Sequence, residues 1–409
     1  MRFKFLFIQL TIATAAVLFF TGCGNGSHIR HVEREDLFTL EIGRLEDQIA
    51  LFDIEGGRGV RTIDIAMRDG LFYIVDGNGA KIQRYNSYGD LLFMIYNEEV
   101  NPPPMSLRHL TDESILTRWA VSYPLLEPGE ITVDSRKHIY VRERLPSDRH
   151  GFDMESRALL DNIVLHFDAD GNFIKHLGRE GAGGSPFPKI EKIHSSFRDE
   201  IAVVCRLPTG WDVYWYDSEG LFLFLIRLRN DALPIPPDRG DVIPSLDTIA
   251  VSPDARRLYV KIDYYHYTRD ESTNTRTGIE PEGSVLWIMN VEDGHWTRYV
   301  DLPFYETFST DQSGRISHRN LYSLFGVVAN GRVFFYVPVE GGYSILVMST
   351  EFGTSGQFRG FIRVENEELH YNVFDLSREG IISGLLADEW QVKLAWWRTD
   401  RMLGDTSQW

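Results

Sequence analysis

The chain has 409 residues, of which 43% are hydrophobic and 25% are charged, and it includes 25 Phe, 18 Tyr and 9 Trp. This composition can form a sizeable core and excludes a disordered or collagen-like chain. The formal charge of −17 would repel phosphate backbones, which argues against nucleic acid as a partner. Only two cysteines are present, Cys23 and Cys205, so the fold cannot depend on a network of disulfides.

The first part of the chain has the pattern of an export signal. Arg2 and Lys4 form a short positive region, and residues 5–20 form an apolar run that is shorter than the roughly 20 residues needed to span a bilayer. Thr and Gly follow this run and lead to Cys23. We therefore predict that residues 1–22 are a signal peptide that does not belong to the fold.

The small residues before Cys23 resemble the lipobox of bacterial lipoproteins, in which the cysteine is acylated, for example with palmitate, and becomes the first mature residue. Phe20 departs from the leucine usual at that position, a departure that spirochaetal lipoproteins tolerate. The resemblance implies attachment to membrane lipid through Cys23 and a location in the cell envelope, facing the periplasm or the exterior. Residues 23–36 are polar and aperiodic and are predicted to be a flexible tether. The alternative is ordinary secretion with cleavage elsewhere.

One pattern of strands and turns recurs along the rest of the chain. In residues 62–95, four stretches rich in β-branched and aromatic residues are separated by turns rich in Gly, Asn and Asp. The same order returns in residues 131–177, 200–228, 248–302, 324–349 and 373–398. A fixed order that repeats in this way is typical of an architecture built from similar units.

The turn after the third stretch aligns across the copies. Tyr85 precedes a turn that ends at Gly89, and Phe167 precedes a turn that ends at Gly171. The glycine supplies the positive φ of a tight hairpin, and the aromatic side chain is expected to pack inward. Gly-rich linkers that end in an aromatic residue, such as residues 178–187, separate the copies. Four-stranded units with such linkers resemble NHL repeats, which build β-propellers.

The resemblance implies an all-β fold, a six-bladed β-propeller of four-stranded antiparallel blades over residues 37–404, followed by a C-terminal tail at 405–409. The last copy lacks a fourth strand. We predict that the segment 37–45 supplies this strand and closes the ring, which leaves no long sheet edge exposed. A pair of β-sandwiches and a seven-bladed ring are the alternatives.

Extra length falls in particular loops of the predicted ring. In a propeller, the second-to-third loop of each blade and the blade-to-blade connections lie on one face, which we call the loop-rich face. The long insertions at residues 96–129, 143–161, 264–284 and 303–318 all map to these positions. Because loops carry function on a rigid scaffold, we expect partners to bind on this face.

Tyrosine, tryptophan and arginine gather in these insertions, and such residues are enriched at protein interfaces. The candidate partner-binding residues are Trp119, Arg144, His150, Tyr264, Tyr265, His266, Tyr267 and Arg269. The alternative for each residue is a structural role, in covering a neighbouring blade or in balancing the acidic surface.

The leading hypothesis is a lipid-anchored propeller that binds a macromolecular partner, an envelope protein, through its loop-rich face, without catalysis and without a cofactor or metal. The 12 His residues show no metal-binding spacing, and no nucleophile motif is present. A second hypothesis is a metal-dependent enzyme of the lactonase or lyase type. Asp64, Asp134 and Asp254 would then face the channel, although the last two also fit the turn that ends a strand. A third hypothesis is a sensor of a small ligand or glycan that uses the Tyr, His and Arg cluster at 264–270.

Overall fold

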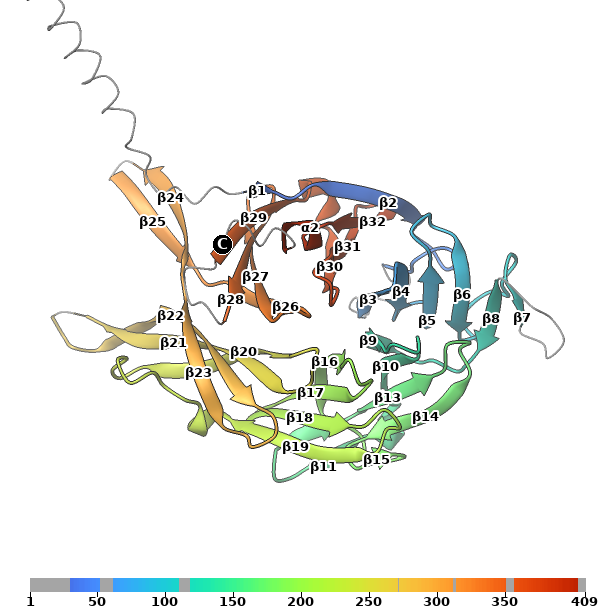
Figure 1. Ribbon diagram of the computed structural model, residues 1–409, viewed down its shortest axis with the longest axis horizontal. Helices are drawn as coiled ribbons and strands as arrows, with labels where there is room; N and C mark the ends of the chain where they lie inside the picture. Colours follow the sequence, from blue (N-terminus) through green and yellow to red (C-terminus); the bar gives the residue numbers. More distant parts are fainter. Residues whose placement is uncertain are drawn as a thin grey trace, which may run out of the picture.

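Six small antiparallel sheets surround a central channel in the computed structural model, so the protein is a six-bladed β-propeller (Figure 1). The structure describes residues 30–51, 62–109, 118–270, 272–311, 314–350 and 357–403. Each blade is a meander in which successive strands pair from the channel outward. The predicted fold class and the predicted number of blades are therefore confirmed.

The strands fall into four groups by their place in a blade. The inner strands are β3 (Ile63–Arg68), β9 (Pro128–Val133), β16 (Lys189–Ser195), β20 (Ile243–Val251), β26 (Ser323–Val327) and β30 (Tyr371–Leu376). The second strands are β4 (Leu71–Asp76), β10 (Ile139–Arg144), β17 (Ile201–Leu207), β21 (Arg257–Arg269), β27 (Arg332–Val339) and β31 (Ile382–Ala387). The third strands are β5 (Lys81–Tyr85), β13 (Asn162–Phe167), β18 (Gly210–Tyr216), β22 (Arg276–Asn290), β28 (Gly342–Ser349) and β32 (Gln391–Trp397). The outer strands are β6 (Leu91–Tyr96), β14 (Phe173–Gly178), β19 (Phe222–Arg229), β23 (Trp296–Leu302), β29 (Gln357–Arg363) and β2 (Arg34–Glu41).

Further short strands and helices lie outside the four-stranded blades. The additional strands are β1 (Arg30–His31), β7 (Arg108–His109), β8 (Trp119–Ser122), β11 (Gly151–Asp153), β12 (Ala158–Leu160), β15 (Gly181–Ala182), β24 (Tyr305–Asp311) and β25 (Gly314–Asn320). The described helices are η1 (Ser147–Arg149), η2 (Asn230–Ala232), η4 (Asn366–Glu368) and α2 (Asp400–Leu403). Strands β8 and β7 extend blade 1, β15 extends blade 2 and β1 extends blade 5, whereas β11–β12 and β24–β25 form separate hairpins.

The ring closes through the N-terminal part of the chain. Strand β2 pairs antiparallel with β32 as the outer strand of blade 6, from Arg34 beside Trp397 to Glu41 beside Gln391. The predicted closure is confirmed. Strand structure already begins at Arg30, however, where β1 pairs with β29. The predicted tether over 23–36 was therefore too long at its C-terminal end, because a polar sequence also suits an outer edge strand. Cys23 and the predicted tail lie outside the described residues.

The core is divided among the seams between blades. Six clusters of buried apolar side chains occur, and each joins the facing surfaces of two neighbouring blades. The cluster between blades 6 and 1 contains Leu40 of β2 together with Ile65 and Leu394. Sheet faces are covered in this way only when every blade has a neighbour on both sides, which makes closure of the ring a condition for burial.

Local sequence signals behave as predicted within this frame. Gly89 and Gly171 have φ of +84° and +86° at the third-to-fourth turns, and Tyr85 and Phe167 before them are fully buried. Cys205 is buried in β17, and burial raises the pKa of its thiol. This cysteine is therefore part of the core rather than a nucleophile.

A cluster of charged side chains stabilises the pairing that closes blade 6. The carboxylate of Glu368 accepts hydrogen bonds from Arg34 Nη1 and Nη2 at 2.6 and 2.8 Å and from Lys393 Nζ at 2.7 Å. Burial alone would raise the pKa of Glu368, but these hydrogen bonds outweigh it and lower the pKa to about 2. The ionised carboxylate therefore connects β2 to β32 and to the loop before β30.

We predict that Glu368→Gln lowers the free energy of unfolding at pH 7 by about 1–3 kcal/mol, because two cations lose their hydrogen-bonded counter-ion. The folded-state pKa of about 2 lies below the ordinary value of 4.5, so this stabilisation is complete above about pH 5 and disappears as the pH falls toward 2. Urea denaturation of both proteins between pH 2 and 7 measures the difference. Glu389→Gln, at an exposed carboxylate of the same blade, is the control and should change stability little. A difference between wild type and Glu368→Gln that stays constant with pH would contradict the assignment.

Candidate functional site

The loop-rich face carries three β-hairpins beyond the blades. The hairpin β11–β12 lies in the second-to-third loop of blade 2, the outer parts of β21 and β22 form that of blade 4, and β24–β25 lies in the connection from blade 4 to blade 5. The direction of the strands puts all three on one face of the ring. Figure 1 shows β24–β25 and the end of β21–β22 projecting beyond the outline of the blades.

The outer part of β21–β22 is a ribbon of two strands without further neighbours. Strand β20 pairs with β21 only as far as Tyr265, and β23 pairs with β22 only from Ser284 onward. Within the described part of the chain, residues 266–269 and 276–283 therefore pair with each other and with no further strand. A two-stranded ribbon gains little stability in water by itself, so its support comes from the buried inner half of the same two strands.

One face of this ribbon is apolar. Tyr267 lies directly opposite Ile279, and Tyr265 lies opposite Pro281, so these four side chains share a face. Ile279 is 57% exposed and Tyr267 is 40% exposed. The guanidinium carbon of Arg276 lies 4.0 Å from the centre of the Tyr267 ring. This contact holds the ring in place while one of its surfaces remains accessible.

The opposite face of the ribbon is polar. His266 Nδ1 lies 3.1 Å from a carboxylate oxygen of Glu282. Arg269 lies on the same side of β21 as Tyr267, at the tip of the ribbon, where its Nη1 donates to the carbonyl of Asn274 at 3.3 Å. Asp270 at the tip accepts hydrogen bonds from Ser272 and other groups, which lower its pKa to about 2. Of the predicted binding residues, Tyr265 and Tyr267 thus lie on the apolar face, whereas His266 and Arg269 make local contacts within the ribbon.

The other two hairpins expose apolar residues as well. Phe152 and Leu159 are cross-strand partners in β11–β12, and both are exposed. Phe308 of β24 is also exposed. The loop-rich face therefore presents several aromatic and aliphatic side chains on separate supports, a pattern typical of protein-binding surfaces.

Arg144 and His150 lie on the loop-rich face, and Arg144 lines a hollow of about 760 Å³. Arg144 Nε donates to Asp161 at 3.0 Å, and a ring nitrogen of His150 lies 2.7 Å from the carbonyl oxygen of Leu145. The hollow is lined mainly by the start of blades 2, 3 and 4. Both predicted residues therefore already serve to order the second-to-third loop of blade 2.

The structure corrects the interpretation of Tyr264. Its side chain is fully buried, and its hydroxyl donates to the carbonyl of Pro234 at 2.6 Å and accepts from Trp287 Nε1 at 2.8 Å. Burial raises the pKa of Tyr264 to about 12. The error arises because Tyr264, the first of the three tyrosines, still lies within the packed part of blade 4, where β20 pairs with β21.

The structure also corrects the placement of Trp119. Strand β8 runs parallel to β6, with Trp119 beside Phe93, and Trp119 Nε1 donates to the carbonyl of Asp170 in a third-to-fourth turn of blade 2 at 2.9 Å. This turn belongs to the opposite side of the ring, which we call the short-turn face. The insertion 96–129 starts on the loop-rich face, but part of it forms strands along the outside of blade 1.

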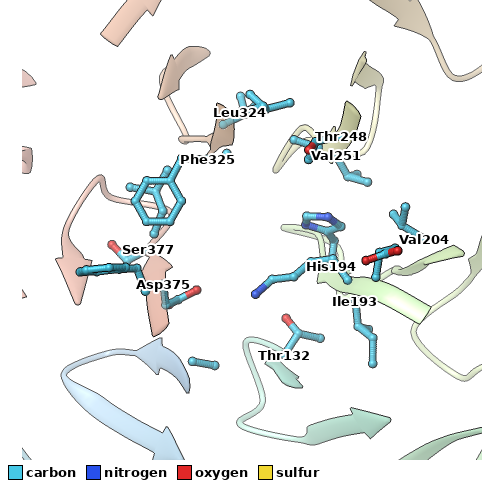
Figure 2. A pocket seen from close by; sticks show the side chains of 18 of the residues that line it. Thr132, Ile193, His194, Val204, Thr248, Val251, Leu324, Phe325, Asp375 and Ser377 are labelled. Atoms are coloured by element: carbon cyan, nitrogen blue, oxygen red, sulfur yellow. The ribbon is translucent and has the colours of Figure 1, made fainter. Parts of the chain in front are cut away.

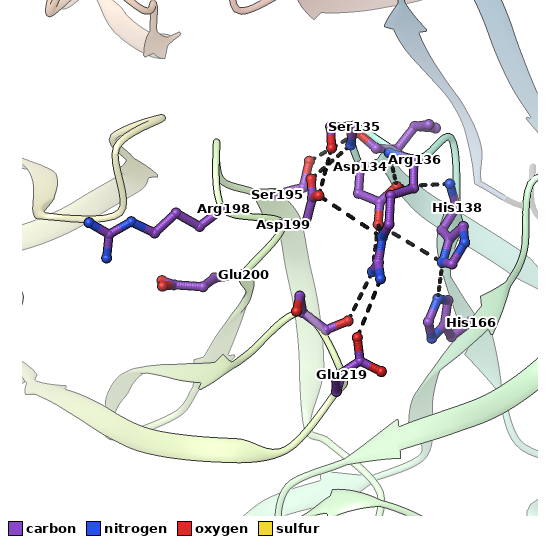
Figure 3. A network of polar contacts seen from close by, with 12 residues as sticks. Asp134, Ser135, Arg136, His138, His166, Ser195, Arg198, Asp199, Glu200 and Glu219 are labelled. Carbon is purple, nitrogen blue, oxygen red and sulfur yellow. Dashed lines mark hydrogen bonds and ion pairs between the residues drawn. The ribbon is translucent and has the colours of Figure 1, made fainter.

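The short-turn face is held together by polar contacts between neighbouring blades (Figure 3). Arg136 of blade 2 contacts Asp134 in its own turn and donates to the carbonyl of Ser218 in blade 3 at 2.9 Å. Ser135 donates to Asp199 of blade 3 through both its backbone N–H and its hydroxyl. The charged groups of this face thus satisfy each other, in contrast to the exposed apolar side chains of the hairpins.

The central channel contains a cavity of about 680 Å³ (Figure 2). Side chains from all six blades line it, among them Lys192, His194 and Asp375 of the inner strands. Lys192 Nζ lies 3.7 Å from a carboxylate oxygen of Asp64, and that oxygen also accepts the backbone N–H of Ile131 at 3.1 Å. Asp64 therefore contacts Lys192 of the cavity lining and connects β3 to β9.

The other two carboxylates of that hypothesis have different roles. Asp134 Oδ1 accepts the backbone N–H groups of Arg136 and His138. Asp254 Oδ1 accepts the hydroxyl of Ser252 and the backbone N–H of Arg256. Both belong to the turns between first and second strands, which confirms the turn interpretation. Among the described residues, no group of three or more His, Cys, Asp or Glu side chains is arranged to hold a metal ion.

Arg378 crosses the channel at the short-turn face. From the turn after β30 in blade 6, its Nη2 donates to the carbonyls of Ser195 and Ser196 at 2.6 and 3.0 Å, although blade 3 lies three positions away in the ring. Its guanidinium carbon also lies 5.5 Å from the centre of the Phe197 ring. Burial, with Arg68 nearby, lowers the pKa of Arg378 to about 10, so the group stays charged at neutral pH. No local pattern predicts this contact, because it depends on how the ring brings two distant turns together.

We predict that Arg378→Met lowers the free energy of unfolding by about 1–3 kcal/mol, because two carbonyl groups at the channel lose a charged donor. Arg363→Met is the matched control, since that side chain is 71% exposed on the outside of blade 5 and should change stability by less than about 0.5 kcal/mol. Guanidinium denaturation of the two variants and the wild type provides the comparison. Equal effects of the two substitutions would mean that the contact across the channel contributes nothing.

Comparisons with known proteins identify no family. No protein-family profile and no curated protein match the sequence. Among solved structures, the chain is similar to the acylaminoacyl peptidase of Pyrococcus horikoshii, with a TM-score of 0.33 and 11% identity over 63% of this chain and 35% of the peptidase. It is also similar to a luciferin-regenerating enzyme (TM-score 0.33, 9% identity, 82% of this chain and 90% of that one) and to a candidate 6-phosphogluconolactonase from Bacteroides fragilis (TM-score 0.34, 10% identity, 86% and 91%). The chain spans only about a third of the peptidase. A search of the described residues for a helix long and apolar enough to cross a membrane finds none.

Proposed function

We propose that the protein is a lipid-anchored, non-catalytic binding protein of the cell envelope that engages a partner protein through the hairpins of its loop-rich face. The observation that carries the proposal is the apolar face of the β21–β22 ribbon, where Tyr267 and Ile279 lie opposite each other and are both exposed. Exposed aromatic and aliphatic pairs on a projecting element are suited to insertion into a complementary surface.

The rigid frame favours such binding. The ribbon continues two strands whose inner halves, including Tyr259 and Ile288, are buried in blade 4. Its position is therefore largely fixed before a partner arrives, which limits the entropy lost on association. The same support applies to a lesser degree to β11–β12, which is held at the end of β10 and the start of β13.

The place where the chain enters the ring supports the predicted lipid anchor. Strand β1 is parallel to β29 and is directed from the short-turn face toward the loop-rich face. Residues 23–29 separate the predicted acylated Cys23 from β1, and these seven residues can extend over at most about 25 Å. An anchor of this length would keep the outside of blade 5 near the lipid and leave the loop-rich face free for a partner.

The partner is expected to offer an apolar surface rather than a charged one. The side chains of the apolar face are Tyr265, Tyr267, Ile279 and Pro281, and the guanidinium of Arg276 lies over the Tyr267 ring at its border. His266 and Glu282 contact each other on the opposite face.

We predict that Tyr267→Ala combined with Ile279→Ala reduces partner capture at least tenfold, because the substitutions remove the apolar contact area of the ribbon. The melting temperature should stay nearly unchanged, since both side chains are exposed. A photo-crosslinking amino acid placed at position 265 in intact cells, followed by mass spectrometry, identifies the captured protein and measures its yield with and without the double substitution.

The matched control is Leu221→Ala combined with Leu223→Ala. These leucines are also exposed, but they lie at the outer strand of blade 3 beside the short-turn face. The control should leave the crosslinked product unchanged. Loss of the product in the control, or its persistence in Tyr267→Ala with Ile279→Ala, would show that the ribbon is not the binding surface.

We further predict that Cys23→Ser abolishes incorporation of labelled palmitate and moves the protein from the detergent phase to the aqueous phase in a phase-partition experiment, because acyl chains supply the membrane affinity. Cys205→Ala serves as the control and should keep the label, since Cys205 is buried in β17. Palmitate incorporation that survives Cys23→Ser would refute the anchor.

A further inference from the structure

The mouth of the channel on the short-turn face carries more positive than negative charge. Six turns that connect inner to second strands surround this mouth. Counted from the last residue of one strand to the first residue of the next, they contain eight Lys or Arg and six Asp or Glu residues. The turns from third to outer strands in blades 1–4, counted in the same way, contain seven Asp or Glu and no Lys or Arg. In a chain with a formal charge of −17, the mouth is therefore a positive patch inside an acidic border.

Two cations of these turns, Arg68 and Arg378, line the channel cavity of about 680 Å³. Arg68 is the last residue of β3 in blade 1, and Arg378 belongs to the turn after β30 in blade 6. The two strands lie side by side, since the carboxylate of Asp375 in β30 accepts the backbone N–H of Met67 in β3 at 3.0 Å. Burial and the nearby charge of Arg68 both lower the pKa of Arg378, so the two guanidinium groups repel each other.

Most donors of these two side chains have no acceptor within the described part of the chain. Arg68 makes no side-chain hydrogen bond there, and its buried Nε has no partner. Its ion pair with Asp69 is long, with 3.9 Å between Nε and the carboxylate oxygen. Arg378 donates only through Nη2, to oxygens of Ser195 and Ser196. Nitrogens of both guanidinium groups are therefore available to an added acceptor.

The acidic groups around the two arginines are exposed or already bound. Asp69 and Glu379, which follow the arginines in their turns, are both exposed. Asp199, which also acts on Arg378, accepts the backbone N–H and the hydroxyl of Ser135. Asp134 accepts two backbone N–H groups of its own turn. These carboxylates leave room for an anion on the cavity side of the two arginines.

The other charged groups of the channel pair with one another. Lys192 Nζ lies 3.7 Å from Asp64 and also attracts Asp375. The carboxylate of Asp375 is bound in addition by the backbone N–H groups of Met67 and Leu376. Further pairs of the lining are Arg206 with Glu191 at 3.9 Å and Asp247 with Lys261 at 3.0 Å. The inner part of the channel is therefore close to balanced, in contrast to the mouth.

Apolar side chains continue the cavity beyond the two arginines. Figure 2 shows Phe325 of blade 5 directed into the cavity, where it makes an edge-to-face pair with Tyr336 at 5.4 Å between ring centres. The backbone N–H of Ala329 donates to the carbonyl of Arg378 at 2.8 Å, which holds the arginine turn against blade 5. The cavity volume lies within the range of about 300–1,000 Å³ that is common for ligand pockets. Its shape and lining suit a ligand with one charged end and an apolar body.

We propose that the channel cavity binds a small organic oxyanion, a carboxylate or a phosphate ester, with its charged group between Arg68 and Arg378 and its apolar body against Phe325. Guanidinium groups bind such oxygens through paired N–H donors, and the bound anion would remove the repulsion between the two arginines. The positive turns around the mouth would attract the anion from solution. The site is formed by inner strands and their turns, so it is separate from the hairpins of the loop-rich face.

Four probes that share a phenyl ring and differ in charge test the proposal. Isothermal titration calorimetry of the full chain in detergent at pH 7.5 measures the binding of benzoate, phenyl phosphate, benzyl alcohol and benzylammonium. We expect benzoate and phenyl phosphate each to bind at least tenfold more tightly than the other two, because only an oxyanion can accept from both arginines. The tighter of the two anions identifies the preferred charged group. Binding of benzylammonium or benzyl alcohol as tight as that of the anions, or no measurable binding of either anion, would overturn the proposal.

Arg68→Met removes one guanidinium group without removing a hydrogen bond of the described residues. We expect this variant to bind the tighter anion at least tenfold more weakly, whereas its melting temperature should not fall, because a buried unpaired donor and a repulsion are removed. Arg256→Met is the matched control. Arg256 lies in the equivalent turn of blade 4 and is exposed, and it is not part of the cavity lining.

The control removes the same charge from the turns around the mouth but no donor from the cavity, so it should weaken binding by less than threefold. Equal effects of Arg68→Met and Arg256→Met would mean that only the general charge of the face attracts the anion, and this result would overturn the site. Unchanged affinity in a folded Arg68→Met protein would overturn it as well.

Discussion

The pairing of β2 with β32 closes the ring, and without this closure the blades could not cover each other's apolar faces. Each blade is a thin sheet that cannot bury both of its faces alone, and the six apolar clusters lie between blades rather than within them. The seam between blades 6 and 1 contains side chains from both ends of the described chain, such as Leu40 and Leu394. Closure of the ring therefore gives every sheet a neighbour on both faces. The contact between Arg34 and Glu368, which are 334 positions apart in the sequence, stabilises this closure.

The closed ring also explains why the two faces differ. On the short-turn face, turns of neighbouring blades are brought together, and their charged groups, such as Arg136 and Asp199, satisfy each other across the seams. Arg378 adds a connection across the channel itself. On the loop-rich face, strands β21 and β22 extend past their neighbours and expose a side that has no partner within the described residues. Polar contacts between blades are therefore concentrated on the short-turn face, and exposed apolar side chains on the loop-rich face.

The channel has both contacts between blades and open space. Its inner strands are held by the surrounding seams, and the contacts of Asp64 with Ile131 and of Asp375 with Met67 connect β3 to β9 and β30 to β3. Asp375 also lines a cavity that side chains do not fill. The carboxylate of Asp375 therefore both connects blades 6 and 1 and borders the open part of the channel.

Much of the architecture follows from local sequence. The number of blades and the closure could be predicted because they depend on properties of short segments. These properties are the repeated strands, the positive φ at Gly89 and Gly171, the buried aromatic residues before these turns and the missing fourth strand of the last copy.

The insertions also indicated the hairpin residues Tyr265 and Tyr267. Their neighbour Tyr264 was misassigned because the depth at which a strand leaves its blade is set by the neighbouring strands. Trp119 was misplaced because an insertion between two blades can add strands to the outside of a sheet. Lys192 and Asp375 carry no local signal at all, since only the ring brings blades 3 and 6 to a common channel. Local sequence thus predicts the repeating unit, because alternation and turn chemistry act over a few residues. Which side chains meet across the ring could not be predicted, because those meetings depend on contacts between blades that are distant in the chain.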